Sequence, residues 1–170
     1  ISNHPPYVIP PYFHPHSDVL EEQIVEYADW SIRQFMQAAE KQPWFDNTIF
    51  VFLGDHGKMV GTPECEMPQS YNHIPLMIYG KDIKPGVYDG FGGQVDVSPT
   101  LLGLLNISYL QNNFGVNLLE EERPCMFFTA DNLIGARDSV NMFIYSPDSQ
   151  QEFKYKLEEG KLHAATGTDE

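Results

Sequence analysis

The sequence has few basic residues and few cysteines, and these shortages exclude several classes of protein. Lysine and arginine number 10 against 24 acidic residues, so the formal net charge is −14. This charge argues against a nucleic-acid binder, which needs a basic surface, and against adhesion to anionic lipid. Two cysteines, Cys65 and Cys125, cannot make a disulfide framework or a zinc knuckle. We expect two isolated thiols, since a bridge between them would require an oxidising compartment.

The chain also lacks a long apolar run, a secretion signal and any internal repeat. No stretch approaches the roughly 18 apolar residues that a membrane-spanning helix needs. The first residue is Ile1 rather than methionine, so we expect a piece of a longer protein, and the missing signals do not locate that protein. Its 170 residues suffice for a single domain with a hydrophobic core, spanning 1–170.

Hydrophobic periodicity predicts an α/β fold with a mostly parallel sheet flanked by helices and short antiparallel strands at the C-terminal end. Residues 1–16 contain five prolines and are expected to form an extended loop. Helices are predicted over 17–41 and 94–105, the second with Asp96 or Ser98 near its cap. The apolar runs that predict strands lie at 48–53, 74–79, 125–130, 140–146 and 152–158, with one more short strand after Gly160. The first two runs are typical of strands covered on both faces.

Two potential metal ligands, Asp55 and His56, lie side by side between Gly54 and Gly57, where the 48–53 strand ends. Sites in open α/β sheets form at such strand ends, and the glycines permit a turn that lets both side chains converge. A carboxylate and a neutral imidazole suit Zn²⁺ or Mn²⁺. The alternative is a solvated turn, in which Asp55 bonds to backbone and His56 is exposed.

Other histidines are weaker candidates. His4 is held between Asn3 and two prolines, which suits a group that must bond one substrate oxygen, but it can equally be a loop residue without a role. His73 precedes an apolar strand and is either a wall of the site or structural. We expect His14, His16 and His163 to lie outside any site, and Asp96 to cap its helix. The hydroxyls of Ser98 and Thr100 have no evident base.

Taken in order, several segments resemble the carboxyl half of the sulfatase branch of the alkaline phosphatase superfamily. Within it, they are most similar to lipoteichoic acid synthase-type phosphoglycerol transferases. The resemblance covers roughly residues 2–119 and adds little for the last fifty residues. The segments that carry it are "SNHPPY", "YAD", "NTIFVFLGDHG", "IPLMIYG", "VDVSPTLLGLLNI" and "FGVNL".

The resemblance implies a partial alkaline phosphatase-like fold and assigns roles to a few residues. Asp55 and His56 would bind the catalytic divalent metal ion, of which Mn²⁺, Mg²⁺, Zn²⁺ and Ca²⁺ all remain open. His4 would contact the phosphate or sulfate of the substrate, and His73 would be a further substrate contact. The family's nucleophile and its other acidic ligand have no match in this chain, so no catalytic residue is assigned and the nucleophile is expected upstream. Two ligands alone should bind metal weakly.

Three functions therefore compete. The first is the C-terminal part of a metal-dependent phosphoglycerol or phosphoryl-group transferase; the others are a sulfuric ester hydrolase and a non-catalytic structural or binding module. The substrate would be an anionic phosphodiester or sulfate ester. The resemblance implies an extracytoplasmic parent protein, anchored in the cell envelope through segments absent here. We also expect a homodimer through an uncovered apolar face.

Overall fold

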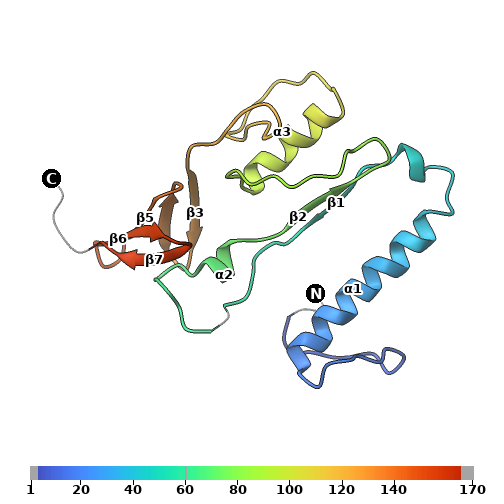
Figure 1. Ribbon diagram of the computed structural model, residues 1–170, viewed down its shortest axis with the longest axis horizontal. Coiled ribbons are helices and arrows are strands. Elements are labelled where there is room, and N and C mark those ends of the chain that lie inside the picture. Colours follow the sequence, from blue (N-terminus) through green and yellow to red (C-terminus); the bar gives the residue numbers. More distant parts are fainter. Residues whose placement is uncertain (1–3, 60, 166–170) are drawn as a thin grey trace. The chain divides into compact units, whose positions relative to one another are not determined.

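The computed structural model describes residues 4–59 and 61–165. The chain divides into two compact units, one made of Ile1–Val51 with Ile78–Ile83 and the other of Phe52–Met77 with Lys84–Glu170. Figure 1 traces the elements along the chain. No helix among the described residues is long and apolar enough to cross a membrane.

The first unit is built around the helix α1, Leu20–Ala39, which confirms the helix expected from the apolar stripe. Ile24 and Ala39 on this stripe are buried. Near the start of the helix, four aromatic rings pack at centroid distances of 5.3–6.5 Å: Tyr12, Phe13, Tyr27 and Trp30. Beyond α1, a 3₁₀ turn (η1, Phe45–Asn47) leads into the first strand. A second aromatic cluster surrounds the buried Phe50.

Strands β1 (Phe50–Leu53) and β2 (Leu76–Tyr79) form a two-stranded sheet. They run antiparallel, because the Gly54 N–H donates to the Pro75 carbonyl at one end and Phe50 meets Tyr79 at the other. The prediction of a mostly parallel sheet is therefore wrong for the described residues, whose sheets are both antiparallel. Connection 54–75 is long enough for either direction, so the sequence did not decide between them.

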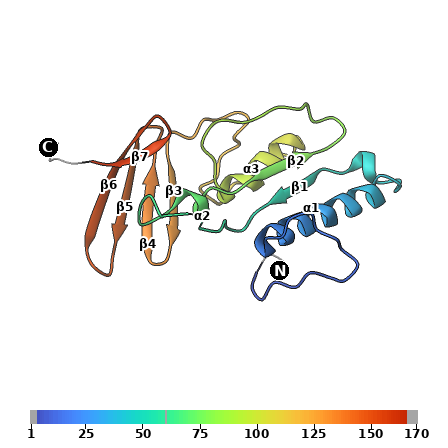
Figure 2. The same ribbon diagram turned by 60° about the horizontal axis from the view of Figure 1, so that its bottom comes forward.

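The second unit contains the helices α2 (Gln69–Asn72) and α3 (Gln94–Leu104) and a five-stranded antiparallel meander. Figure 2 shows this meander, in which each strand pairs with the next along the chain. The α3 helix and four of the strands confirm the expected elements, whereas β4 and α2 were not predicted. The strands are β3 (Met126–Ala130), β4 (Leu133–Arg137), β5 (Asn141–Ser146), β6 (Gln151–Glu158) and β7 (Lys161–Ala164).

The core of the second unit lies between the meander and the segment that leads into α2. Met142 and Ile144 of β5 are almost fully buried, and they pack with Cys65 and Met67. The Cys65 thiol donates to the Met67 carbonyl at 3.1 Å. Cys65 and Cys125 are both free thiols, as expected. The meander thus holds the chain immediately before α2, which in turn contacts the candidate site.

Candidate functional site

The turn after β1 presents His56 with one particular ring nitrogen available. Its Nδ1 lies 2.8 Å from the Gly57 carbonyl oxygen. A carbonyl oxygen only accepts, so Nδ1 must carry the hydrogen and donate it. In the neutral imidazole, the lone pair is then on Nε2, which is the form that binds a metal ion. The backbone thereby selects the ligating tautomer of His56.

Asp55 supplies a second potential metal ligand beside this imidazole. Its Oδ1 accepts a hydrogen bond from the His56 backbone N–H at 2.9 Å. That bond, followed by the charge of His56, lowers the pKa of the Asp55 carboxyl, which keeps it ionised at neutral pH. The free Oδ2 lies 4.0 Å from His56 Nε2, and the Asp55 side chain is 92% exposed. Both side chains are therefore solvent-accessible, and the Asp55 carboxylate is ionised.

Neighbouring helices fix the turn through its backbone. From the start of α3, the Gln94 side-chain amide donates to the carbonyl oxygens of Gly54 and Asp55, at 3.2 and 3.0 Å. From α2, the Tyr71 carbonyl accepts the Gly57 N–H at 2.8 Å. The Tyr71 ring also stacks on the His56 imidazole, with centroids 5.2 Å apart and planes 26° apart. Residues of α2 and α3 thus hold the turn that carries Asp55 and His56.

Gly57 is required here by a close approach of backbone rather than by an unusual φ. A Cβ at this position would lie 2.2 Å from the Ser70 carbonyl oxygen, well inside contact distance. A Cβ on Gly54 would meet Ile74 and Pro75 at 3.5 Å or more, which is ordinary contact. The second glycine of the motif therefore lets α2 pack directly against the turn.

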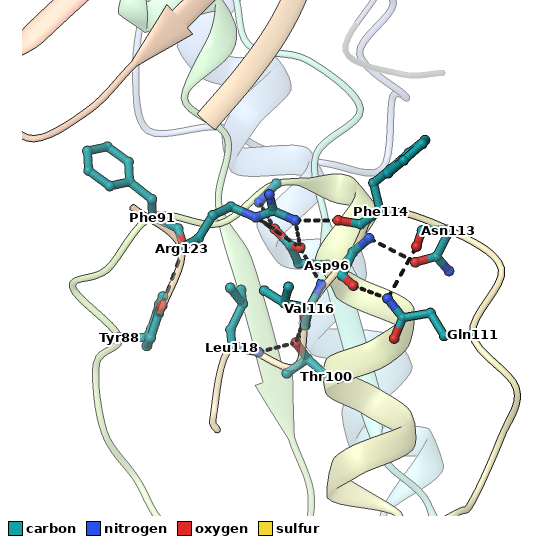
Figure 3. Close-up of polar contacts among 12 residues, drawn as sticks. Tyr88, Phe91, Asp96, Thr100, Gln111, Asn113, Phe114, Val116, Leu118 and Arg123 are labelled. Atoms are coloured by element: carbon teal, nitrogen blue, oxygen red, sulfur yellow. Dashed lines mark hydrogen bonds and ion pairs between the residues drawn. The ribbon is translucent and has the colours of Figure 1, made fainter. Parts of the chain in front are cut away.

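The first turn of α3, which carries Gln94, is anchored by the fully buried carboxylate of Asp96 (Figure 3). This carboxylate accepts the Gly93 and Val116 backbone N–H groups, both at 2.8 Å. The Arg123 guanidinium donates to both carboxylate oxygens, at distances from 2.6 Å, and also to the Phe114 carbonyl. Burial alone would raise the pKa of Asp96, but the bonds from Arg123, Val116 and Gly93 outweigh it and lower the pKa. Asp96 caps its helix as predicted.

Asp55 and His56 line a hollow of about 870 Å³ that lies within the second unit. His73, whose backbone N–H donates to the Gln69 carbonyl at 2.7 Å, is exposed on this hollow. The structure thus brings three of the predicted site residues to one hollow. Residues from several separate segments line it, including Asp55, His56, His73, Gln94, Met126 and Arg137.

The remaining histidines lie in parts of the chain that the structure describes, but they are not among the residues that line this hollow. His4 belongs to the first unit, where its exposed ring contacts the Pro5 carbonyl at 3.2 Å. Its role as a substrate contact stays a prediction. His16 pairs with Glu26 at 3.3 Å, and His163 is exposed at the end of the meander. Neither has a surrounding that indicates chemistry.

Asp55 and His56 fit two positions of a metal site but do not complete one. The 4.0 Å between Oδ2 and Nε2 exceeds the roughly 3.4 Å that tetrahedral coordination with bonds of about 2.1 Å requires, so these two exposed side chains must move slightly closer to share one ion. In the described part of the chain, no group of three or more His, Cys, Asp or Glu side chains is placed to hold a metal. Exposure and the backbone bond of Asp55 also agree with a solvated turn. The fixed tautomer of His56 favours the ligand interpretation.

Three residues of the site were missed by sequence reasoning. Tyr71 lies on α2, a helix of four residues that is too short to show a periodic pattern. Gln94 could only be recognised as the first residue of a helix. Arg137 lies on β4, the strand that was not predicted. No sequence signal connected any of them with the Asp-His pair.

Comparison with known proteins identifies the family of the chain. The family profile named Sulfatase matches residues 1–107. Lipoteichoic acid synthase 1 of Bacillus subtilis is 28% identical over 155 residues, which cover 82% of this chain and 24% of that protein. Choline-sulfatase of Rhizobium meliloti is 29% identical, over 63% of this chain and 22% of that protein. The chain thus spans about a quarter of the length of these curated relatives.

A crystal structure of a protein in the alkaline phosphatase superfamily from Vibrio parahaemolyticus superposes with a TM-score of 0.83. The match covers 99% of this chain and 43% of that chain, at 24% identity, and it establishes the fold alone. It confirms the expected partial alkaline phosphatase-like α/β fold. Together with the profile match over residues 1–107, these findings show that the chain belongs to the sulfatase family.

Proposed function

We propose that this chain is the C-terminal part of a divalent-metal-dependent phosphoglycerol or phosphoryl-group transferase. Members of the sulfatase family are enzymes that act on sulfate or phosphate esters and generally use divalent metal ions. The observation that carries the proposal is the pair Asp55 and His56, which presents a carboxylate and a bare Nε2 on a fixed turn that lines a hollow. Lipoteichoic acid synthase 1, which matches 82% of the chain, supports the transferase class.

In this mechanism the chain supplies and orients two metal ligands. A bound divalent ion would neutralise charge on the transferred group and activate a nucleophilic hydroxyl. Asp55 remains ionised, and the Gly57 carbonyl holds His56 in its ligating tautomer. Gln94 and Tyr71 keep the turn in place, so that the ligands need little reorganisation when the ion binds. The nucleophile and the remaining ligands belong to the part of the protein that precedes this chain.

Histidines contribute to substrate binding in this proposal. His73 faces the hollow and can donate to a substrate oxygen. His4 donates to an oxygen of the phosphate or sulfate group. The parent protein is extracytoplasmic and anchored in the cell envelope. This chain by itself forms a homodimer through an uncovered apolar face, for which exposed side chains such as Met77 and Tyr79 of β2 are candidates.

A sulfuric ester hydrolase is the second candidate, because choline-sulfatase matches the chain with similar identity over a shorter part. In either chemistry, Asp55 and His56 would hold a divalent metal ion. They differ in the ester that is cleaved and in the acceptor. A non-catalytic module predicts that neither ester is turned over through Asp55 and His56, so one set of assays separates all three.

The test compares variants of the full-length protein on bis-p-nitrophenyl phosphate and p-nitrophenyl sulfate with added Mn²⁺. Asp55→Asn and His56→Gln should each reduce kcat/KM by about 100- to 1000-fold, since a metal ion supplies several kcal/mol of transition-state stabilisation. Asp29→Asn and His14→Gln are the matched controls, because both residues are exposed on the first unit. Preference for the phosphodiester indicates the transferase class. Unchanged turnover in both site variants would exclude the catalytic proposal.

A further inference from the structure

We infer that Arg137 of β4 binds an anionic group of the substrate, a phosphate or sulfate oxyanion, in the hollow that contains Asp55 and His56. The inference rests on the function proposed above and extends it to the binding of the substrate. Arg137 lines this hollow, and it is the one lysine or arginine among the lining residues that the structure describes. It belongs to the C-terminal meander, for which the sequence indicated no role.

The Arg137 side chain is held in one orientation by neighbours that do not neutralise it. Its Nη1 donates to the Gln69 side-chain oxygen at the start of α2. Its guanidinium carbon lies 6.0 Å from the centre of the Phe91 ring, within the range of a cation–π contact. A neutral amide and an aromatic ring orient the guanidinium and leave its charge uncompensated. This is the arrangement expected of a preformed anion site.

Arg137 also lacks the partners that a half-buried arginine normally has. Its Nε is buried and has no hydrogen-bond partner among the described residues. None of the ion pairs in the described part of the chain includes Arg137. By contrast, Arg123, whose side chain is also largely buried, forms an ion pair with Asp96 and donates a hydrogen bond to the Phe114 carbonyl. Withdrawing a cation from water without an anion is unfavourable, so a bound oxyanion would compensate Arg137.

The charges around the hollow favour a cation there when the substrate is an anion. The other formally charged side chains that line it are the carboxylates of Asp55, Asp89 and Asp131, in a protein of net charge −14. These charges would repel an anionic ester. A metal ion at Asp55 and His56 offsets part of the repulsion, and Arg137 supplies a second positive charge. Nη1 donates to Gln69 and Nε is buried, so the remaining N–H groups at the end of the guanidinium are those that donate to a phosphate or sulfate oxygen.

The test uses the 170-residue chain and follows the arginine Nε–H signals by ¹H–¹⁵N NMR during titration with potassium phosphate, potassium sulfate and potassium chloride at matched ionic strength. The Arg137 Nε–H signal should shift saturably with phosphate or sulfate and not with chloride. Arg137→Gln should weaken this binding, followed through backbone amides around the hollow, by about tenfold or more, as expected for loss of a charge-assisted hydrogen bond. Arg137→Lys should retain part of it.

Lys154→Gln is the matched control, because it removes the same charge from an exposed position on β6 of the same meander. It should change the binding by less than about twofold. If Arg137→Gln keeps the fold, judged by its amide spectrum, and binds phosphate and sulfate as the unaltered chain does, the inference is wrong. A static Nε–H signal at saturation would also overturn it. Failure of the metal mechanism would appear separately, as unchanged turnover in Asp55→Asn and His56→Gln.

Discussion

Replacing Asp96 with alanine is expected to lower the free energy of unfolding of the chain by about 3–5 kcal/mol. The carboxylate is fully buried and accepts hydrogen bonds from two backbone N–H groups and from the Arg123 guanidinium. Alanine would leave both N–H groups without an acceptor, as well as a guanidinium whose side chain is only 15% exposed. Each lost bond to a charged acceptor contributes about 1.5–3 kcal/mol, and partial hydration of Arg123 recovers some of the sum.

The partnership with Arg123 gives this prediction a second, more specific part. Arg123→Ala leaves the Asp96 charge buried with two N–H donors, so it should also destabilise the chain strongly. The double variant leaves neither charge behind. Its cost should therefore be at least about 1.5 kcal/mol smaller than the sum of the two single costs. Additive costs would show that the two side chains act independently.

Urea unfolding followed by far-ultraviolet circular dichroism measures these changes. Asp29→Ala is the control, because its pair with Arg33 is an exposed i, i+4 pair on α1, and its effect should be close to zero. Should Asp96→Ala fail to fold, Asp96→Asn keeps one acceptor oxygen and should give a smaller loss. A loss below about 1 kcal/mol for Asp96→Ala would refute the reasoning, because a fully buried carboxylate leaves little room for water to replace the missing bonds.

The lowered pKa of Asp96 also predicts how the contribution depends on pH. A carboxyl whose pKa is lower in the folded state stabilises the fold fully above its unfolded value of about 3.9. The contribution is lost as pH falls through the lowered, folded-state pKa. The stability difference between the unaltered chain and Asp96→Ala should therefore be constant from pH 5 to 7 and shrink toward pH 2. A constant difference down to pH 2 would contradict the assignment.

Two smaller changes test the support of the site. Gly57→Ala forces a Cβ against the Ser70 carbonyl and should cost about 1–3 kcal/mol in urea unfolding, whereas Gly54→Ala should cost less, since its Cβ meets only ordinary contacts. Ile144→Ala empties a fully buried position under the meander and should cost about 2–5 kcal/mol. Ile134→Ala makes the same chemical change at a side chain that is 46% exposed, so near-equal losses for the two isoleucines would contradict the assigned core.

The sequence predicted the two longer helices and most of the strands, but not the direction in which the strands pair, for physical reasons. An apolar stripe over 17–41 needs only local spacing to indicate α1, and Asp96 lies at its expected place in α3. Strand direction depends on partners far along the chain, so the apolar runs of β1 and β2 could not reveal it. Strand β4 was missed because its run, "LIGAR", is short and contains glycine and alanine, which have weak strand preference.

For the site, the sequence predicted which residues could bind a metal but not what holds them. Asp55 and His56 were recognisable because two ligand types stood between glycines at a strand end. The tautomer of His56 depends on the Gly57 carbonyl, and the turn depends on Gln94 and Tyr71. No sequence motif predicts these contacts, because they are made by backbone groups and by a glutamine and a tyrosine, which are common in many other settings.

The C-terminal meander is the part for which sequence reasoning found no role, and the contacts of the described residues assign it one. Its buried face packs Met67, two residues before α2, against Ile144. Arg137 of the same sheet bonds Gln69, the first residue of α2. Because α2 also carries Tyr71, which holds the Asp-His turn by its carbonyl and its ring, the meander constrains the turn of Asp55 and His56 through one short helix. Chemistry assigned to residues 55 and 56 thus depends on strands that begin seventy residues later, through contacts that only the folded chain displays.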